Sequence, residues 1–444
     1  IMITDQESTN QKWHQGVSRY AWLVLAVASL GWVFDSMDQH LYNLVANVSL
    51  MELLAKRIPE AQLQSAATAW RGAITAVFLI GWAIGGFFFG ILGDKIGRTR
   101  TMMITILMYA GFTGLCTFVK SPEQYMALRF LTALGIGGEF AAGVALVAEV
   151  WPQRSRPMAL GMLQALSAFG NIFAARFVYS VGDSNWRTVY IIGVVPALLV
   201  VWIRARVKEP ERWQHAKDEA EQSGHVEELG NIKDLFRDPV LRRNTAAGVL
   251  LALAGVGVLW GVGFWLKDLL DLVAKSLNYT PQQRSNLGTM AFLSQNIGAF
   301  FGIYTYAAFS ERVGRRPALF VFFVLAFLAV QATFWLTDTP TEAIVYPAIM
   351  GYCAVAPFSA FAIYFPELYP TRLRSTGVGF CYNCARILAA AAPFTLGKLS
   401  AVFAGQYGAL LGFRMACSVV TCVYIFGFIG LIFAPETRGK PLPE

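Results

Sequence analysis

The sequence predicts an all-α membrane protein in which twelve transmembrane helices form two pseudo-symmetric six-helix bundles. Three observations carry this prediction: the composition, a series of twelve apolar segments, and two loops that occur once in each half. Of 444 residues, 56% are hydrophobic and 14% are charged, whereas soluble proteins carry about 25% charged residues. So few charges cannot cover the surface of soluble domains, which excludes a water-soluble enzyme.

Six apolar segments in the first half are long enough to cross a membrane, because a helix needs about 20 mostly apolar residues to do so. Their approximate bounds are 20–45, 70–92, 101–119, 123–149, 157–182 and 186–206. The first segment contains two aspartates and has no small-residue cleavage site near its end, so we expect it to remain as a span and not to act as a signal peptide.

Six further segments follow a polar stretch that contains no apolar span. Their approximate bounds are 244–272, 285–309, 317–337, 342–366, 375–403 and 407–435. We therefore divide the chain into an amino-terminal bundle (1–206), a cytoplasmic linker (207–243) and a carboxyl-terminal bundle with a short cytoplasmic tail (244–444).

The positions of the positive charges indicate how the helices are oriented. Lys and Arg gather in the tails and in the loops on one side, which the positive-inside rule assigns to the cytoplasm. We expect both termini in the cytoplasm and the protein in the inner or plasma membrane. The net charge of +8 is then mostly a topology signal, so we expect no nucleic-acid partner.

The six cysteines all lie in uncharged segments, so no disulfide framework is expected. Cys381 and Cys384 form a lone C-x-x-C pair without a second ligand pair. We interpret them as small helix residues and expect no metal site.

Two loops repeat at nearly one offset. Gly93–Arg98 returns 217 positions later as Ser310–Arg315, and Glu149–Arg156 returns 218 positions later as Glu367–Arg374. Because both repeats fall at matching places among six helices, the halves are related by duplication. Parallel six-helix repeats with a site between them are a transporter architecture.

Several motifs resemble those of the major facilitator superfamily. Gly90–Arg100 resembles its loop between the second and third helices, and Arg129–Glu139 is similar to the fourth-helix signature of its sugar-porter, organic-ion and metabolite:proton symporter branches. Lys208–Arg212 and Pro435–Lys440 resemble the closing motifs of those branches. The resemblance covers essentially the whole chain and implies a secondary transporter.

Two shorter segments narrow the resemblance. Asp35–Asp38 is similar to the Asp-x-x-Asp of acid:proton symporters, and the segment around Arg386 is similar to the arginine segment of organic-anion transporters and of aromatic-acid or sialate symporters. Together they favour an anionic cargo over a neutral sugar.

Charges inside spans are costly, at least about 2.5 to 3.5 kcal/mol near the membrane centre, so each one has a reason. Asp38 and Arg129 lie at similar depth on antiparallel spans, and they can pair either as a proton-coupling switch, as the resemblance implies, or as a permanent salt bridge. Asp35 lies one turn before Asp38, and two close carboxylates do not both ionise easily. Glu139 either relays protons or holds a glycine-lined turn.

Arg386 lies about 16 Å into its span, near the midplane, and no acidic residue shares that span. A guanidinium offers a planar fork suited to a carboxylate, so Arg386 either binds an anionic substrate or pairs with Asp35 or Glu139. Other polar or aromatic residues in the spans either contact substrate or join helices: Gln164, Ser167, Asn171, Gln295, Asn296, Tyr382, Trp260, Trp265 and Tyr364.

The repeated loops supply the candidate gate. We expect ion pairs between Glu149 and Arg154 or Arg156 in one half, and between Glu367 and Arg372 or Arg374 in the other. The candidate gating residues are Asp94, Arg98, Glu149, Arg156, Glu311, Arg315, Glu367 and Arg374.

The sequence thus predicts a proton-coupled symporter of a small organic anion, a carboxylate metabolite, that works by alternating access. The alternative is a proton-coupled sugar or polyol porter. We expect a monomer in the lipid bilayer whose partners are the substrate and protons, with no cofactor and no enzymatic activity.

Overall fold

The computed structural model describes residues 13–55, 57–181 and 185–444, and these residues form helices and loops without a strand. The first half contains α1 (Arg19–Leu54), α2 (Glu60–Ile96), α3 (Arg98–Leu115), α4 (Pro122–Val150), α5 (Arg156–Val181), α6 (Trp186–Ile192) and α7 (Pro196–Arg206). Two short helices, α8 (Glu211–Ser223) and α9 (Asp234–Arg237), lie in the linker.

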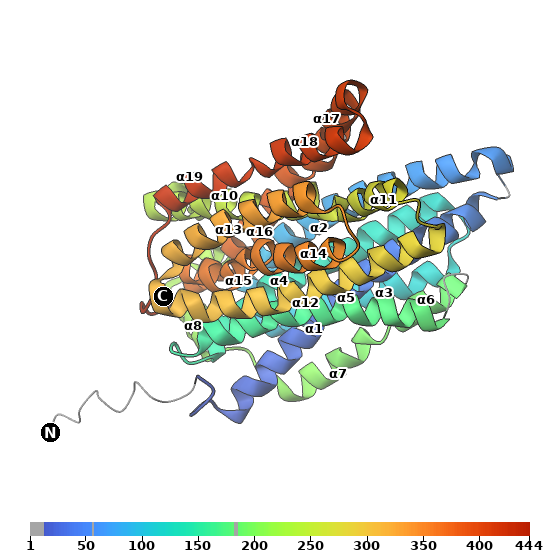
Figure 1. Ribbon diagram of the computed structural model, residues 1–444. Helices are drawn as coiled ribbons and strands as arrows, with labels where there is room; N and C mark the ends of the chain where they lie inside the picture. Colours follow the sequence, from blue (N-terminus) through green and yellow to red (C-terminus); the bar gives the residue numbers. More distant parts are fainter. Residues whose placement is uncertain (1–12, 56, 182–184) are drawn as a thin grey trace.

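The second half repeats the pattern with more interruptions. Its helices are α10 (Pro239–Gly261), α11 (Leu266–Ser276), α12 (Pro281–Val313), α13 (Arg315–Leu336), α14 (Glu342–Ala354), α15 (Pro357–Leu368), α16 (Arg374–Ala389), α17 (Ala391–Tyr407), α18 (Ala409–Thr421) and α19 (Tyr424–Phe433). The helices run roughly side by side, and α1 begins at the end of the molecule where α19 stops, which we call the terminus face (Figure 1).

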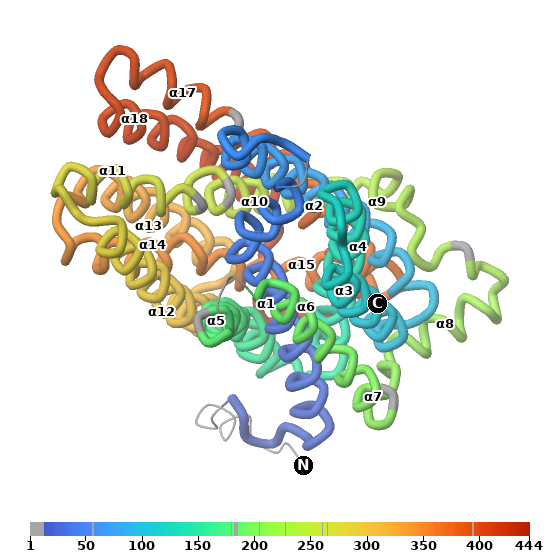
Figure 2. Tube along the Cα trace, turned by 90° about the vertical axis from the view of Figure 1, so that its right-hand side faces the viewer, coloured from blue at the N-terminus to red at the C-terminus, as the bar shows by residue number. Residues whose placement is uncertain are grey.

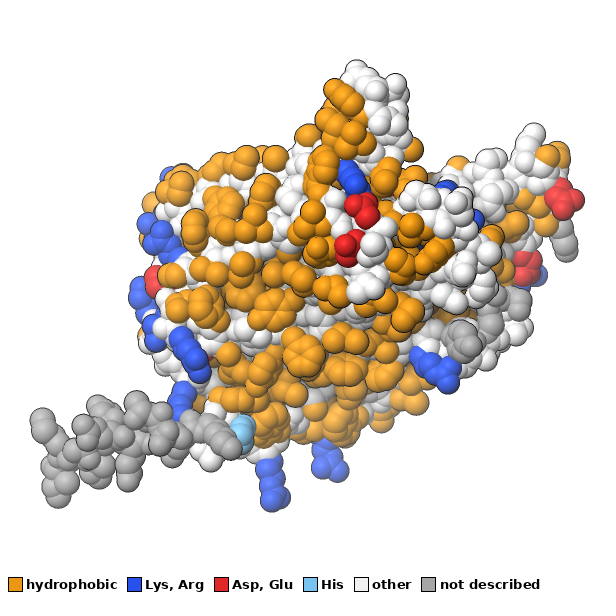
Figure 3. Space-filling view, viewed as in Figure 1, with side chains coloured by type: hydrophobic (Ala, Val, Ile, Leu, Met, Phe, Trp, Pro, Cys, Tyr) orange, Lys and Arg blue, Asp and Glu red, His pale blue; other side chains and the backbone are white. Residues whose placement is uncertain are grey.

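The surface is that of an integral membrane protein. Among the described residues, nine helical segments are long and apolar enough to cross a membrane. Large apolar side chains are exposed around the bundle, for example Phe118, Leu198 and Ile432, which are 74%, 70% and 71% exposed. Apolar side chains cover the side of the bundle, and many Lys and Arg side chains gather at the terminus face (Figure 3).

Several predicted spans are built from two consecutive helices. The sixth span is divided into α6 and α7, and the tenth into α14 and α15, with a proline at the start of the second helix in each case. Proline lacks the N–H that would continue the hydrogen-bond ladder, so the interruption follows from Pro196 and Pro357. In the eleventh and twelfth spans the break lets α17 and α18 project away from the other helices (Figures 1 and 2).

Packing in the two halves shows the duplication directly. A Cβ atom on Gly85 of α2 would overlap the carbonyl oxygen of Leu134 in α4, and a Cβ on Gly302 of α12 would overlap that of Tyr352 in α14. The two contacts are 217 and 218 positions apart. Helix association in lipid favours small residues at close crossings, so the same close crossing is built twice.

Candidate functional site

The first part of the site is a buried ion pair between α1 and α4. Arg129 Nη1 lies 3.0 Å from Asp38 Oδ2, and their side chains are 0% and 2% exposed. Thr113 of α3 donates a 2.6 Å hydrogen bond from its hydroxyl to Asp38 Oδ1. The Arg129 guanidinium also lies 4.9 Å from the Tyr42 ring and 4.8 Å from the Phe78 ring. Asp38 and Arg129, which the sequence places at similar depth on antiparallel spans, are therefore in contact.

A second acidic pair lies deeper in the bundle. Asp35 and Glu139 are each 2% exposed. None of their carboxyl oxygens accepts a hydrogen bond from an N–H group or a hydroxyl of the described residues. Their carboxyl groups are within hydrogen-bonding reach of each other. A Cβ on Gly31 would overlap Glu139 Oε1, so a glycine leaves the space that Glu139 fills. Two adjacent carboxyls can share one proton.

Arg386 of α16 is held by neutral groups. Its Cζ atom lies 3.9 Å from the ring of Trp82 in α2 and 3.9 Å from that of Tyr382. Nη1 donates a 2.8 Å hydrogen bond to Asn383 Oδ1. The side chain is buried, and no ion pair joins it to a described carboxylate within 4.0 Å, so the alternative of a salt bridge with Asp35 or Glu139 is not realised in this conformation.

Aromatic rings surround this arginine and join the two halves. Tyr382 of α16 stacks on Phe140 of α4, with ring centroids 4.7 Å apart and planes at 27°. Phe140 in turn lies 4.8 Å from Trp32 of α1. Phe140 follows Glu139 in the chain and stacks on Tyr382, which in turn contacts Arg386. These rings, an aromatic wall, therefore connect Arg386 to the acidic pair, and Asp35 is close enough to act electrostatically on Arg386.

The polar residues predicted along one face of α5, Gln164, Ser167 and Asn171, differ in their contacts. Asn171 donates a 2.9 Å hydrogen bond to Asn296 Oδ1 of α12, which joins the two halves, and the Ser167 hydroxyl donates to the backbone oxygen of Gln164. Gln164 Oε1 is buried without a hydrogen-bond donor among the described residues. Gln295 is partly buried in α12. The side chain of Trp260 falls outside the described part of the structure.

The terminus face is closed by charged side chains from the repeated loops. Within the first half, Arg98 contacts Asp94 at 3.0 Å and Glu149 at 2.9 Å. Within the second half, Arg315 contacts Glu311 at 2.6 Å and Glu367 at 3.0 Å. The repeat in the sequence is thus a repeat in space.

Across the halves the contacts are asymmetric. Arg374 Nη1 lies 2.7 Å from Glu149 Oε1. Asp94 accepts hydrogen bonds from the backbone N–H groups of Ser375 and Thr376 at 3.1 and 2.8 Å, at the start of α16. A carboxylate at a helix N-terminus satisfies unpaired N–H groups and the helix dipole. Asp94 and Glu149 therefore fasten α16 to the first half.

The partners of the glutamates differ from the predicted ones. Glu149 pairs with Arg98 and with Arg374 of the other half, and Glu367 pairs with Arg315, while Arg372 pairs with Asp234 of the linker at 2.6 Å. Glu367 also accepts a 2.6 Å hydrogen bond from the Thr437 hydroxyl. The predicted ion pairs were wrong because they joined residues close in the sequence. The observed partners of the two glutamates instead depend on how neighbouring helices and the two bundles pack. Arg156 makes no ion pair with Glu367 within 4.0 Å.

The linker and the tail brace this face. Trp213 of α8 donates from its indole to the Asp94 carbonyl, and Arg374 Nη2 donates to the Pro443 carbonyl. Glu436 accepts backbone N–H groups of Arg315 and Arg316. Burial alone would raise the pKa of the Glu436 carboxyl, but hydrogen bonds from backbone N–H groups hold that pKa below its usual value. Glu436 therefore stays ionised where it caps α13.

Some residues at the site were not anticipated. Trp82 covers Arg386 from the opposite half, and Asn383 accepts its hydrogen bond. Asn383 lies three positions before Arg386, on the same helix face, so the spacing was a usable signal. Nothing in the sequence links Trp82 to Arg386 or Thr113 to Asp38, because those contacts depend on how separate helices pack.

Known proteins resemble this chain along most of its length. The family model described as Major Facilitator Superfamily matches residues 21–393. The probable 4-methylmuconolactone transporter of Cupriavidus pinatubonensis is 30% identical over 92% of this chain and 89% of its own length. The cis,cis-muconate transport protein of Acinetobacter baylyi is 28% identical over 84% of this chain and 87% of its own length.

A solved structure has the same fold. The proton:xylose symporter XylE superposes with a TM-score of 0.74 and 16% identity, covering 95% of this chain and 98% of that one. At this identity the likeness concerns the fold alone. It agrees with the predicted arrangement of twelve helices in two bundles.

Proposed function

This chain belongs to the Major Facilitator Superfamily and is a multi-pass membrane transporter, and from that premise we propose that it carries a small organic anion together with a proton. The cargo in this proposal is a carboxylate metabolite that binds between the two halves. The amino-terminal bundle (1–206) and the carboxyl-terminal bundle (244–444) then move against each other, joined by the linker at 207–243.

The observation that carries the proposal is the environment of Arg386. Its charge is buried between two aromatic rings and one amide oxygen, and a charge inside the membrane is costly unless it is compensated. A substrate carboxylate would compensate it with charge-assisted hydrogen bonds. Tyr382, and the polar residues Gln164, Asn171, Gln295, Asn296 and Trp260, are the further candidates for substrate contacts.

The aromatic wall favours a flat acid. The rings of Trp82 and Tyr382 lie against the guanidinium, and Phe140 stacks on Tyr382. A planar conjugated or aromatic acid that reaches Arg386 would replace one of these contacts by stacking on the ring that it exposes. The names of two relatives, a muconolactone transporter and a muconate transport protein, support an organic acid. A sugar would leave the charge of Arg386 uncompensated.

Proton coupling is assigned to the acidic residues of the first half. In the proposal, Asp38 pairs with Arg129 while it is ionised, and protonation breaks the pair and frees Arg129. Asp35 and Glu139 hold a second exchangeable proton between them, close to Arg386. Arrival of a carboxylate at Arg386 would change the field at this pair, which links substrate binding to protonation.

Alternating access needs a gate that opens, and the contacts of Asp94 and Glu149 with α16 are the proposed gate at the terminus face. The pairs of Arg315 with Glu311 and Glu367 hold the second half together while it moves. We place the terminus face, and with it both chain ends, in the cytoplasm, because Lys and Arg gather there.

A ligand screen tests the cargo before any transport assay. Purified protein is heated with planar carboxylic acids, neutral sugars and amines, because a ligand that binds the folded state raises the melting temperature. Acids such as cis,cis-muconate are expected to stabilise the wild type but not Arg386→Gln. Arg414→Gln is the matched control, since Arg414 pairs with Asp338 and with the Thr337 carbonyl, and neither residue contacts Arg386. Stabilisation by sugars alone would favour the sugar-porter alternative.

A further inference from the structure

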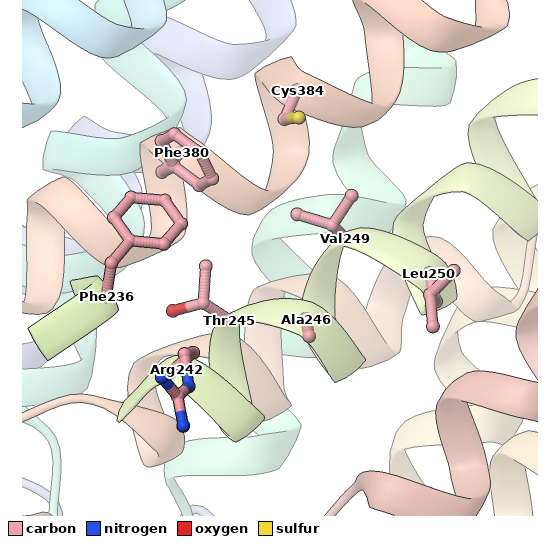
Figure 4. Close-up of a pocket in the computed structure, with 8 residues that line it drawn as sticks. All are labelled: Phe236, Arg242, Thr245, Ala246, Val249, Leu250, Phe380 and Cys384. Carbon is pink, nitrogen blue, oxygen red and sulfur yellow. The ribbon is translucent and has the colours of Figure 1, made fainter. Parts of the chain in front are cut away.

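A groove with no role in the proposed transport lies on the outside of the second half (Figure 4). It has a volume of about 420 Å³ and runs between α10 and α16, with α9 at one end. Phe236 of α9 and Phe380 of α16 lie side by side, with ring centroids 5.3 Å apart. Ala246 and Val249 of α10 and Cys384 of α16 continue the lining, which is almost wholly apolar.

Arg242 is the charged residue of this lining, and it stands at one end of the groove. It lies in the first turn of α10, near the terminus face. Val249 is seven residues further along the helix, about 10 Å deeper at 1.5 Å per residue. Half of a membrane core is about 15 Å thick, so the groove runs from the membrane surface into the hydrocarbon of one leaflet.

Arg242 is available to bind an anion. Its side chain is exposed, and its guanidinium makes no ion pair or hydrogen bond within the described chain. The two nearby acids are engaged elsewhere: Asp234 pairs with Arg372, and Asp238 caps α10 through the N–H groups of Val240 and Leu241. Exposed Arg237 and Arg243 make this rim more positive.

Exposed apolar side chains lie beside these positive charges at the rim. Phe236 is 47% exposed and Val240 is 59% exposed, although both lie next to charged residues at the end of the membrane span. An arginine at a helix end places its charge among lipid headgroups while its stem lies along apolar surface. The groove therefore presents an anion-binding group above an apolar channel.

We propose that this groove binds an anionic phospholipid of the leaflet at the terminus face. One acyl chain lies along Phe380, Ala246 and Val249, and Arg242 binds the phosphate. A free organic acid such as the cargo would fill the charged end but leave the apolar length empty, which is why we favour a lipid. This inference does not depend on the identity of the cargo.

The groove lies beside the interface between the two halves. Phe380 also contacts Phe87 of α2, with ring centroids 5.4 Å apart, and α16 is the helix that Asp94 caps. A bound acyl chain would fill the outer side of this packing, so we expect the lipid to favour the conformation in which the terminus face is closed.

Native mass spectrometry of the detergent-purified protein, titrated with phosphatidylglycerol or phosphatidylcholine, tests the site. The wild type is expected to bind one phosphatidylglycerol more tightly than phosphatidylcholine. Arg242→Gln should weaken phosphatidylglycerol about tenfold, the loss expected for one charge-assisted contact, and remove the preference. Arg243→Gln is the matched control, because Arg243 is the next residue and does not line the groove.

A second variant tests the apolar part. Ala246→Trp places a large side chain in the groove on an exposed helix position, so both lipids should be lost while the melting temperature stays near the wild-type value. Equal phosphatidylglycerol binding by Arg242→Gln and wild type would overturn the headgroup assignment, and retained binding by Ala246→Trp would overturn the acyl channel. Displacement of the lipid by millimolar inorganic phosphate would show an anion site and not a lipid site.

Discussion

Glu149 of α4 and Arg374 of α16 lie 2.7 Å apart and form an ion pair between the two halves. Its counterpart by internal symmetry would join Glu367 to Arg156, and that ion pair is not formed within 4.0 Å. Of the two symmetry-related ion pairs possible at the terminus face, only one is therefore formed between the halves. This asymmetry separates Glu149, whose ion pair is proposed to break when the terminus face opens, from Glu367, whose ion pair is proposed to hold the second half together.

The first prediction compares two glutamates. Removing one member of a buried ion pair costs about 3 to 5 kcal/mol, and Glu149→Gln removes the pair that crosses the halves. We expect it to open the terminus face and to raise labelling of a buried reporter, Ser375→Cys, about tenfold or more. Glu367→Gln removes a pair within one half, so it should lower the melting temperature with little effect on labelling.

The labelling needs a background in which the exposed Cys422 and the partly exposed Cys384 are replaced. Glu123→Gln is the control, because Glu123 forms an exposed pair with Arg57. Equal labelling of the Glu149 and Glu367 variants would contradict the assignment of the gate.

The second prediction concerns Asp38. Asp38→Asn cannot take part in a protonation cycle, so it should abolish accumulation driven by a proton gradient while exchange of substrate across the membrane continues. Counterflow and gradient-driven uptake in proteoliposomes separate the two activities. Asp338→Asn, an exposed carboxylate at the other face, should behave as the wild type. Uphill uptake by Asp38→Asn at the normal rate would move the role to Asp35 or Glu139.

The third prediction concerns Arg386. Arg386→Lys keeps the charge but loses the planar fork, and Arg386→Ala loses both, so affinity for an anionic ligand should fall in that order. A charge-assisted hydrogen bond contributes about 1.5 to 3 kcal/mol, which is roughly 10- to 150-fold in affinity for Arg386→Ala. Titration calorimetry at fixed pH measures it. If Arg386→Ala binds the anion as tightly as the wild type, the arginine is structural.

The fourth prediction concerns the paired carboxyls of Asp35 and Glu139. Glu139→Gln lets the new amide donate a hydrogen bond to Asp35, so the protein should fold with an unchanged or higher melting temperature. The number of protons moved per substrate should nevertheless fall. A fall in melting temperature with an unchanged proton ratio would assign Glu139 to packing against Gly31.

The fifth prediction concerns the duplicated helix crossing. Gly85→Ala and Gly302→Ala place a methyl group against a backbone carbonyl, and such overpacking costs about 1 to 3 kcal/mol. Gly111→Ala is the control, because nothing lies within 4 Å of its added Cβ. Thermal unfolding in detergent should lower the melting temperature of the first two variants and leave the third unchanged.

Much of the fold could be predicted from the sequence, because lipid imposes a length and a composition on every span. The contact between Asp38 and Arg129 was also predictable, since two antiparallel helices of known rise place the residues at one depth. The Arg374 partner of Glu149 and the Trp82 cover of Arg386 were not, because both depend on how the second bundle docks on the first. No local pattern encodes that docking.

Proton movement that accompanies the cargo distinguishes proton-coupled symport from uniport and exchange. Proteoliposomes without a pH gradient are given cis,cis-muconate, and the external pH is followed with a dye. Symport predicts that the external medium becomes more alkaline with wild type and Arg414→Gln, and does not change with Asp38→Asn or Arg386→Ala. An alkaline shift with xylose and none with any carboxylic acid from the screen would contradict proton-coupled transport of an organic acid.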